Sequence, residues 1–165
     1  MINIEALTQG YDATEDRIHI DVRDKAGASL RLWLTRRLSD VVIRGLCDSL
    51  ERSRGRGDSN FDQFLQTVDQ RAAQAGRKGG EPVRWQGEAV LLISVDLTRV
   101  ENGRRLTFKT RLAGQQQGVA TVALDEQRLR QWLSIVYRLY RTAGWPEDAW
   151  PDWLKTASKT MPMDT

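Results

Sequence analysis

Residues 17–50 constrain the fold more than any other stretch, because their apolar residues change spacing partway along. Apolar and polar residues alternate over 18–23 and again over 30–35, which places each apolar set on one face of a strand. Gly27 between the two runs suits a hairpin turn. After Thr35 the spacing becomes three and four residues, through Leu38, Val41, Val42, Leu46 and Leu50. The stretch therefore predicts a β-hairpin followed by an amphipathic helix with one buried stripe, capped by Thr35.

A looser version of the same plan returns in residues 88–144. Two alternating runs, 89–100 and 104–112, flank Asn102-Gly103, a pair typical of tight hairpin turns. A short strand over 119–124 leads to a helix that Asp125 caps and Gly144 ends. With a first strand in residues 2–11, we expect an α+β fold built on antiparallel sheet, with the helices on one face. It would contain two pseudo-repeated strand-strand-strand-helix halves.

The length of 165 residues suits a single domain. We divide it into a first half (1–51), a linker plus short helix (52–87), a second half (88–144) and a Trp-rich tail (145–165). The segment RSRGRGDS is typical of a linker, and the short helix after it has Phe61, Phe64, Leu65 and Val68 on one face. We expect the tail tryptophans, Trp145, Trp150 and Trp153, to fold back onto the core, since exposed aromatic clusters are uncommon.

Composition and charge exclude several classes of protein. Hydrophobic residues at 40% and charged residues at 28% describe an ordinary globular chain. No apolar run reaches the length of a membrane span, and the N-terminus lacks the features of a signal peptide. The lone Cys47 cannot form an intramolecular disulfide, and we interpret it as a small buried residue of a cytoplasmic protein. A net charge of +3 permits nucleic-acid binding without requiring it.

The sequence contains no convincing catalytic or metal-binding pattern. His19 is the only histidine and lies within a predicted strand, so neither a Ser-His-Asp nor a Cys-His arrangement has support. One cysteine and one histidine do not make a typical zinc site. The RGRG and RKGG runs lack the strand-before, helix-after context of a phosphate loop. We predict a protein that is not an enzyme, with no catalytic residues, no metal and no cofactor.

The run GYDATEDRIHI followed by RLWLTRRL resembles a pattern in small proteobacterial proteins with no known activity. The resemblance covers roughly the first third of the chain; it implies a bacterial origin and no particular chemistry. In architecture alone, duplicated strand-strand-strand-helix halves are similar to Pur-alpha and Whirly-type single-strand binders. That similarity implies binding on a sheet face.

Helices on one face of a sheet leave the other face exposed or free to dimerise. Cations beside an aromatic ring suit single-stranded nucleic acid, which needs charge for phosphates and ring area for bases. The predicted site for single-stranded DNA or RNA consists of Arg23, Arg31, Trp33, Lys109 and Arg111. A plain solvated face, with Trp33 packed under the tail, is an equal alternative. The second function is a protein-interaction or assembly module, including a homodimer, based on the Trp-rich tail and exposed sheet edges; an enzyme ranks third.

Overall fold

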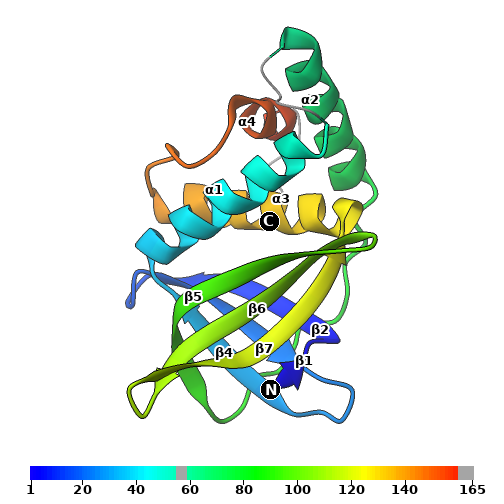
Figure 1. The fold of residues 1–165 in the computed structure, drawn as a ribbon. Coiled ribbons are helices and arrows are strands. Elements are labelled where there is room, and N and C mark those ends of the chain that lie inside the picture. Colours follow the sequence, from blue (N-terminus) through cyan, green and yellow to red (C-terminus); the bar gives the residue numbers. More distant parts are fainter. Residues whose placement is uncertain (55–58, 160–165) are drawn as a thin grey trace.

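The computed structural model describes residues 1–54 and 59–159, which form an α+β fold. Their strands make one curved sheet, and their helices lie to one side of it (Figure 1). The order across the sheet is β1-β7-β6-β5-β4-β3-β2. The strands are β1 (Ile2–Asn3), β2 (Ala6–Asp12), β3 (Arg17–Arg23), β4 (Ser29–Leu34), β5 (Ala89–Val100), β6 (Gly103–Leu112) and β7 (Gln115–Asp125). Residues 55–58 of the predicted linker and 160–165 of the predicted tail lie outside the described residues.

The sheet is mixed, so the prediction of a wholly antiparallel sheet is wrong. β1 pairs with β7 and β4 pairs with β5 in parallel, whereas the other neighbouring strands are antiparallel. Each parallel pair joins strands that are distant in the sequence, and such pairs need a long connection rather than a turn. The turn residues that predict a hairpin within each half do not indicate which distant strands pair in parallel.

The N-terminal segment joins the two edges of the sheet. β1 lies at one edge and β2 at the other, yet only residues 4 and 5 separate them in the chain. The N–H of Ile4 donates to the carbonyl of Thr121 on β7, and the N–H of Glu5 donates to that of Arg23 on β3. The sheet is therefore curled until its edges meet, which removes the exposed edges that the sequence suggested there.

The two predicted hairpins form, but their glycines act for different reasons. Gly27 has φ +92°, a conformation that side chains rarely adopt, so the β3–β4 turn needs a glycine. Gly103 has no positive φ; a Cβ built there would lie 2.0 Å from the carbonyl oxygen of Leu124 on β7. The Asn102-Gly103 pair thus marks a close approach of two strands as well as a turn.

Two helices cover the inner face of the sheet, α1 (Arg36–Arg52) and α3 (Glu126–Ala143). Thr35 Oγ1 accepts from the N–H of Leu38, and an Asp125 carboxylate oxygen accepts from that of Arg128, so both predicted N-caps are confirmed. Gly144 ends α3 in the left-handed conformation, also as predicted. Between these helices and the sheet lies the core, which includes Ile20, Leu32, Phe108 and Leu133.

A second helical layer contains α2 (Asn60–Ala75) and α4 (Asp152–Ser158), which lie on the far side of α3 from the sheet (Figure 1). α2 buries a polar face. Gln66 and Gln70 are fully buried and accept hydrogen bonds from the guanidinium of Arg130, which is only 1% exposed. The apolar face of α2 points outward, with Phe61 67% exposed and Phe64 60% exposed.

The Trp-rich tail folds back onto the core, as predicted. Trp145, Trp150 and Trp153 are all at least 95% buried. The indole N–H of Trp153 donates to the carboxylate of Glu51 at 2.9 Å, and the rings of Trp145 and Trp150 pack edge-on against Tyr140. The three buried rings add large apolar area to the core, so the described part of the tail is an integral part of the fold.

Candidate binding groove between α1 and β5

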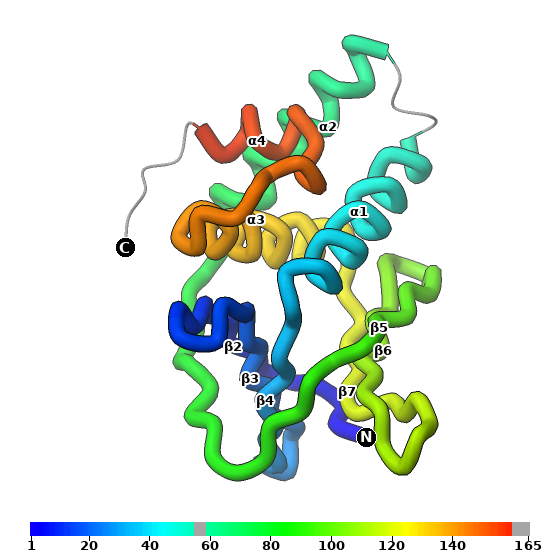
Figure 2. Tube along the Cα trace, turned by 90° about the vertical axis from the view of Figure 1, so that its left-hand side faces the viewer, coloured from blue at the N-terminus to red at the C-terminus, as the bar shows by residue number. Residues whose placement is uncertain are grey.

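The most open part of the sheet lies along β5. β4 pairs with β5 only at Ala89, Val90 and Leu91 of β5. β4 itself ends at Leu34, where the chain leaves the sheet and enters α1. From Leu92 to Val100, β5 pairs with β6 alone among the described strands. One edge of this portion therefore carries backbone N–H and C=O groups with no strand beside them. α1 passes above this edge (Figure 2).

A hollow of about 610 Å³ separates α1 from β5. Its walls are mainly aliphatic, with Val41, Val42 and Leu46 from α1 and Leu92, Val95 and Leu97 from β5. Val41 is 61% exposed and Leu97 is 38% exposed. Because Val41 belongs to the stripe predicted to be buried, its exposure corrects that prediction. We call this hollow, with its continuation described next, the α1–β5 groove.

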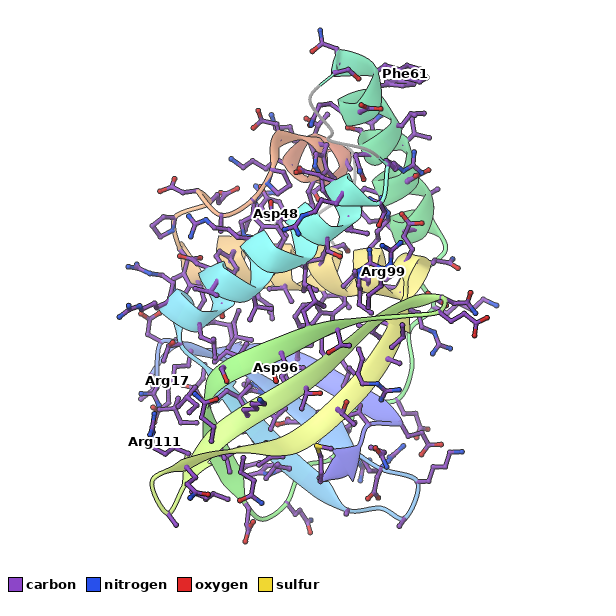
Figure 3. The ribbon with its side chains drawn as sticks, in the orientation of Figure 1. Arg17, Asp48, Phe61, Asp96, Arg99 and Arg111 are labelled. Atoms are coloured by element: carbon purple, nitrogen blue, oxygen red, sulfur yellow. The ribbon has the colours of Figure 1, made fainter. Side chains whose placement is uncertain are left out.

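The continuation is a second hollow of about 250 Å³, which shares Gly45 and Leu97 with the first. The charged residues of the described chain that line the two hollows are all arginines: Arg37 in the first, and Arg52, Arg99 and Arg104 in the second. Figure 3 shows Arg99 near the end of β5 that faces the helices. The α1–β5 groove therefore combines aliphatic walls with positive charge toward both ends.

Only one of these arginines has its charged group held by the protein. Arg104 donates to the hydroxyl oxygens of Ser49 and Ser53 and to the carbonyl of Ser49, and so fixes β6 to the last turns of α1. Among the described residues, Arg37, Arg52 and Arg99 form no hydrogen bond or ion pair through their side chains. Unpaired cations beside aliphatic walls suit a ligand that carries both acidic and apolar groups.

The predicted nucleic-acid site lies on the opposite, outer face of the sheet. Arg31 and Trp33 are neighbours there, but the guanidinium of Arg31 is bound by both oxygens of Asp21, at 2.6 and 2.8 Å. These hydrogen bonds raise the pKa of Arg31. The same guanidinium lies 5.4 Å from the ring centre of Trp33 and 4.2 Å from that of Trp85. Its charge is neutralised, and it occupies ring area that a base would need.

The other predicted binding residues are dispersed. Lys109 forms an ion pair with Asp96 on β5. Arg111 is exposed, donates to the carbonyl of Gly114 at 3.3 Å and lies near the end of the sheet away from the helices (Figure 3). Arg23 is exposed at the end of β3. The outer face thus brings Arg31 and Trp33 together but gathers no cluster of free cations around an open ring.

His19 completes this outer-face arrangement. Its Nδ1 lies 3.6 Å from an oxygen of Asp21, and its ring packs edge-on against Trp33. Burial, followed by the nearby Arg31 guanidinium, lowers the pKa of His19, so its ring is neutral at neutral pH. A Cβ on Gly10 would lie 2.7 Å from the imidazole, which explains the glycine in the facing strand. The group is a packed structural cluster.

Two signals in the sequence could have revealed the α1–β5 groove. The first is strand length, since β5 has 12 residues and β4 has 6, so β4 cannot cover its neighbour. The second is Arg37, one of two arginines in the first turn of a helix, where the dipole disfavours positive charge. Neither signal shows which strands are neighbours, which is why the groove was missed.

In residues 1–54 and 59–159, no helix is long and apolar enough to span a bilayer. The same residues contain no group of three histidine, cysteine or acidic side chains that could bind a metal ion. Comparison of the chain with protein-family models, with curated proteins and with solved structures finds no match.

Proposed function

We propose that this protein is a protein-interaction module whose partner binds in the α1–β5 groove. The observation that carries the proposal is the unpaired half of β5, which forms one wall of an aliphatic hollow whose charged lining, among the described residues, consists of arginines. Exposed apolar patches with a polar rim are typical of interaction sites, and an open strand edge is a common place for another chain to bind.

Charge supports a polypeptide partner with acidic residues. The unpaired Arg37 and the pair Arg52 and Arg99 belong to different parts of the groove. Opposite charges at these positions would orient the partner and speed its association. The exposed aliphatic side chains between them would be buried on binding, at a gain of roughly 25 cal/mol for each Å² of apolar area removed from water.

A selection of displayed random peptides against the full chain tests this proposal. Val41→Asp places a carboxylate in the groove, and Val68→Asp makes the same change at an exposed valine on α2. We expect selected peptides that combine acidic and apolar residues, and that lose affinity for Val41→Asp while retaining it for Val68→Asp. Peptides that bind both variants equally, or no enrichment at all, would count against the groove as the binding site.

Single-stranded nucleic acid on the outer face remains the second candidate. Arg23 and Arg111 favour it, because neither forms an ion pair within the described residues. Fluorescence anisotropy with labelled single-stranded DNA and RNA across a salt series tests it, with Trp33→Ala and Arg111→Ala beside the parent chain. Binding at low salt that both variants weaken would support this candidate, since electrostatic attraction is strongest there. Absence of binding at low salt would remove it.

We also infer that the two halves are repeats of one unit, as the strand-strand-strand-helix plan suggests. Support comes from element order alone: β2, β3 and β4 precede α1, and β5, β6 and β7 precede α3. Superposition of the two halves with matched strand registers would test the idea, and mismatched registers would refute it. A cytoplasmic location, a bacterial origin and the absence of catalysis stay predictions.

A further inference from the structure

We infer that the partner binds as an additional β-strand along the open edge of β5, in residues 92–100, with acidic side chains facing the groove arginines. This inference rests on the proposed function and specifies the conformation and charge of its partner. It identifies the ligand class as an extended, acidic and apolar peptide segment.

The backbone of β5 provides the first argument. Its open portion keeps pairing with β6 through the residues from Ser94 to Val100, so it has strand geometry without a partner on the other side. Unpaired N–H and C=O groups along such an edge match those of an incoming strand. Among the described residues, no side chain forms a hydrogen bond with the backbone of residues 92–100. The carbonyl of Leu91, just before this portion, accepts from Thr110 on β6.

A bulge at Ile93 provides the second argument. Leu92 pairs with Thr110 and Ser94 pairs with Lys109, so Ile93 is an extra residue in β5. The bulge lies two residues after Leu91, the last residue that pairs with β4. Because bulges bend and twist a strand, this one turns the remainder of β5 away from the line of β4. The opening between the two strands is therefore built into the fold.

The alternation of side chains along β5 defines what the partner must present. Val95 and Leu97 point into the groove, whereas Asp96, which lies between them, pairs with Lys109 on the outer face. An added strand has the same period of two. Every second side chain would enter the aliphatic hollow, and carboxylates toward the ends of the strand would face Arg37 and the pair Arg52 and Arg99.

An extended partner fits these features better than a helical one. A helix satisfies its own backbone hydrogen bonds, so it would bury the open edge of β5 without pairing it. Unpaired backbone groups that become buried cost free energy. An extended segment pairs that edge and also covers the aliphatic wall, as in other cases of strand addition.

The test uses a selected acidic peptide and a series of copies, each with one backbone N–H replaced by N-methyl. We expect the affinity to fall at least about tenfold at alternate positions, where an N–H bond to β5 is lost, and to change little at the positions between. Amide hydrogen exchange should slow in β5 residues 92–100 on binding. Arg37→Glu should weaken binding about tenfold, whereas Arg71→Glu on the exposed surface of α2 should leave it unchanged.

Each of the other outcomes overturns a stated part of the inference. If N-methylation has no positional effect while Val41→Asp still blocks binding, strand addition is wrong and the groove remains the site. If no peptide is sensitive to Val41→Asp, the groove and the added strand both fail. If the chain without peptide forms dimers that Val41→Asp dissociates, as measured by analytical ultracentrifugation, the occupant is a second copy and not a separate partner.

Discussion

The two inner helices each pass close to the first strand of the other half, but only one of these junctions is open. α1 lies beside β5, and α3 lies beside β2. At the α1–β5 junction the described chain leaves a hollow of about 610 Å³. At the α3–β2 junction another part of the chain fills the corresponding space. Residues 77–88 run beside β2 (Figure 2). Val83 of this segment is 6% exposed, and its N–H donates to Thr8 Oγ1 at 2.7 Å.

The tail completes the cover on the α3 side. Trp145 follows directly after α3, packs edge-on against Tyr11 of β2 and donates its indole N–H to Asp16 at 2.8 Å. Residues 77–88 and the beginning of the tail, which both lie outside the strand-strand-strand-helix plan, thus contribute to this one side. Two units with the same element order therefore have different surfaces, because the additional segments pack on one of them only.

The largest effect should come from Trp145→Ala, which removes the main cover of the α3–β2 junction. We expect a loss of about 3–5 kcal/mol in the free energy of unfolding, because a large buried side chain is replaced by a cavity. Urea denaturation followed by circular dichroism measures it. A loss below about 0.5 kcal/mol, the size of an ordinary surface change, would mean that the tail is not part of the cooperative fold.

Val83→Asp should have the next largest effect, because it buries a carboxylate between the 77–88 segment and β2. We expect a loss of about 3 kcal/mol, the order of magnitude for an unpaired buried polar group. Glu81→Gln, an exposed change in the same segment, serves as the control and should not alter the urea midpoint. Equal urea midpoints for both variants would show that Val83 is not packed against β2. The α3–β2 junction would then be as open as the α1–β5 junction.

Asp16→Asn should destabilise the covered junction at neutral pH, and its difference from the parent chain should shrink in acid. Hydrogen bonds from Tyr11 and then Trp145 lower the pKa of Asp16 below its ordinary value of 3.8. A lowered folded-state pKa means that this stabilisation is present above the ordinary pKa and is lost as the pH falls through the folded value. The variant should therefore flatten the dependence of thermal stability on pH below about pH 4. An unchanged acid slope would contradict this role for Asp16.

The smallest effect on stability is expected for Val41→Asp in the α1–β5 groove. Since Val41 is 61% exposed, the free energy of unfolding should change by no more than about 0.5 kcal/mol. Differential scanning calorimetry measures the shift. A marked destabilisation would indicate that the groove is a packed region of the fold, and it would also disqualify this variant as a probe of binding.

Sequence reasoning succeeded where the signal is local. Helix ends depend on residues only three or four positions apart in the chain. The residue types near each end were therefore sufficient to predict the caps at Thr35 and Asp125 and the helix end at Gly144. The hairpins likewise follow from alternation and a turn. The burial of the tail tryptophans was also predicted, because large aromatic side chains seldom remain exposed in clusters.

The sequence predicted the helices and strands better than it predicted which face of each one is buried. Phe61 and Phe64 do share a face of α2, but that face is exposed, because the opposite face supplies Gln66 and Gln70 to the buried Arg130. Arg31 was predicted to be a free cation, but Asp21 from the neighbouring strand pairs with it. In both cases the partner that decides the outcome comes from another element, which periodicity cannot identify.

Local signals in the sequence were enough for the two hairpins and for α1 and α3 with their caps, because these depend on backbone preferences and on contacts within a few residues. The strand predicted over 119–124 begins at Gln115 instead, the one predicted in 2–11 is divided into β1 and β2, and α4 was not predicted. Three features follow from the tertiary structure alone: β4 and β5 lie parallel, β1 and β2 join the edges of the sheet, and a hollow remains between α1 and β5. Those features depend on contacts between residues far apart in the chain, which compete with one another for the same apolar surface. The candidate binding site belongs to this second group, because the hollow depends on how α1 and β5, which are distant in the chain, are spaced.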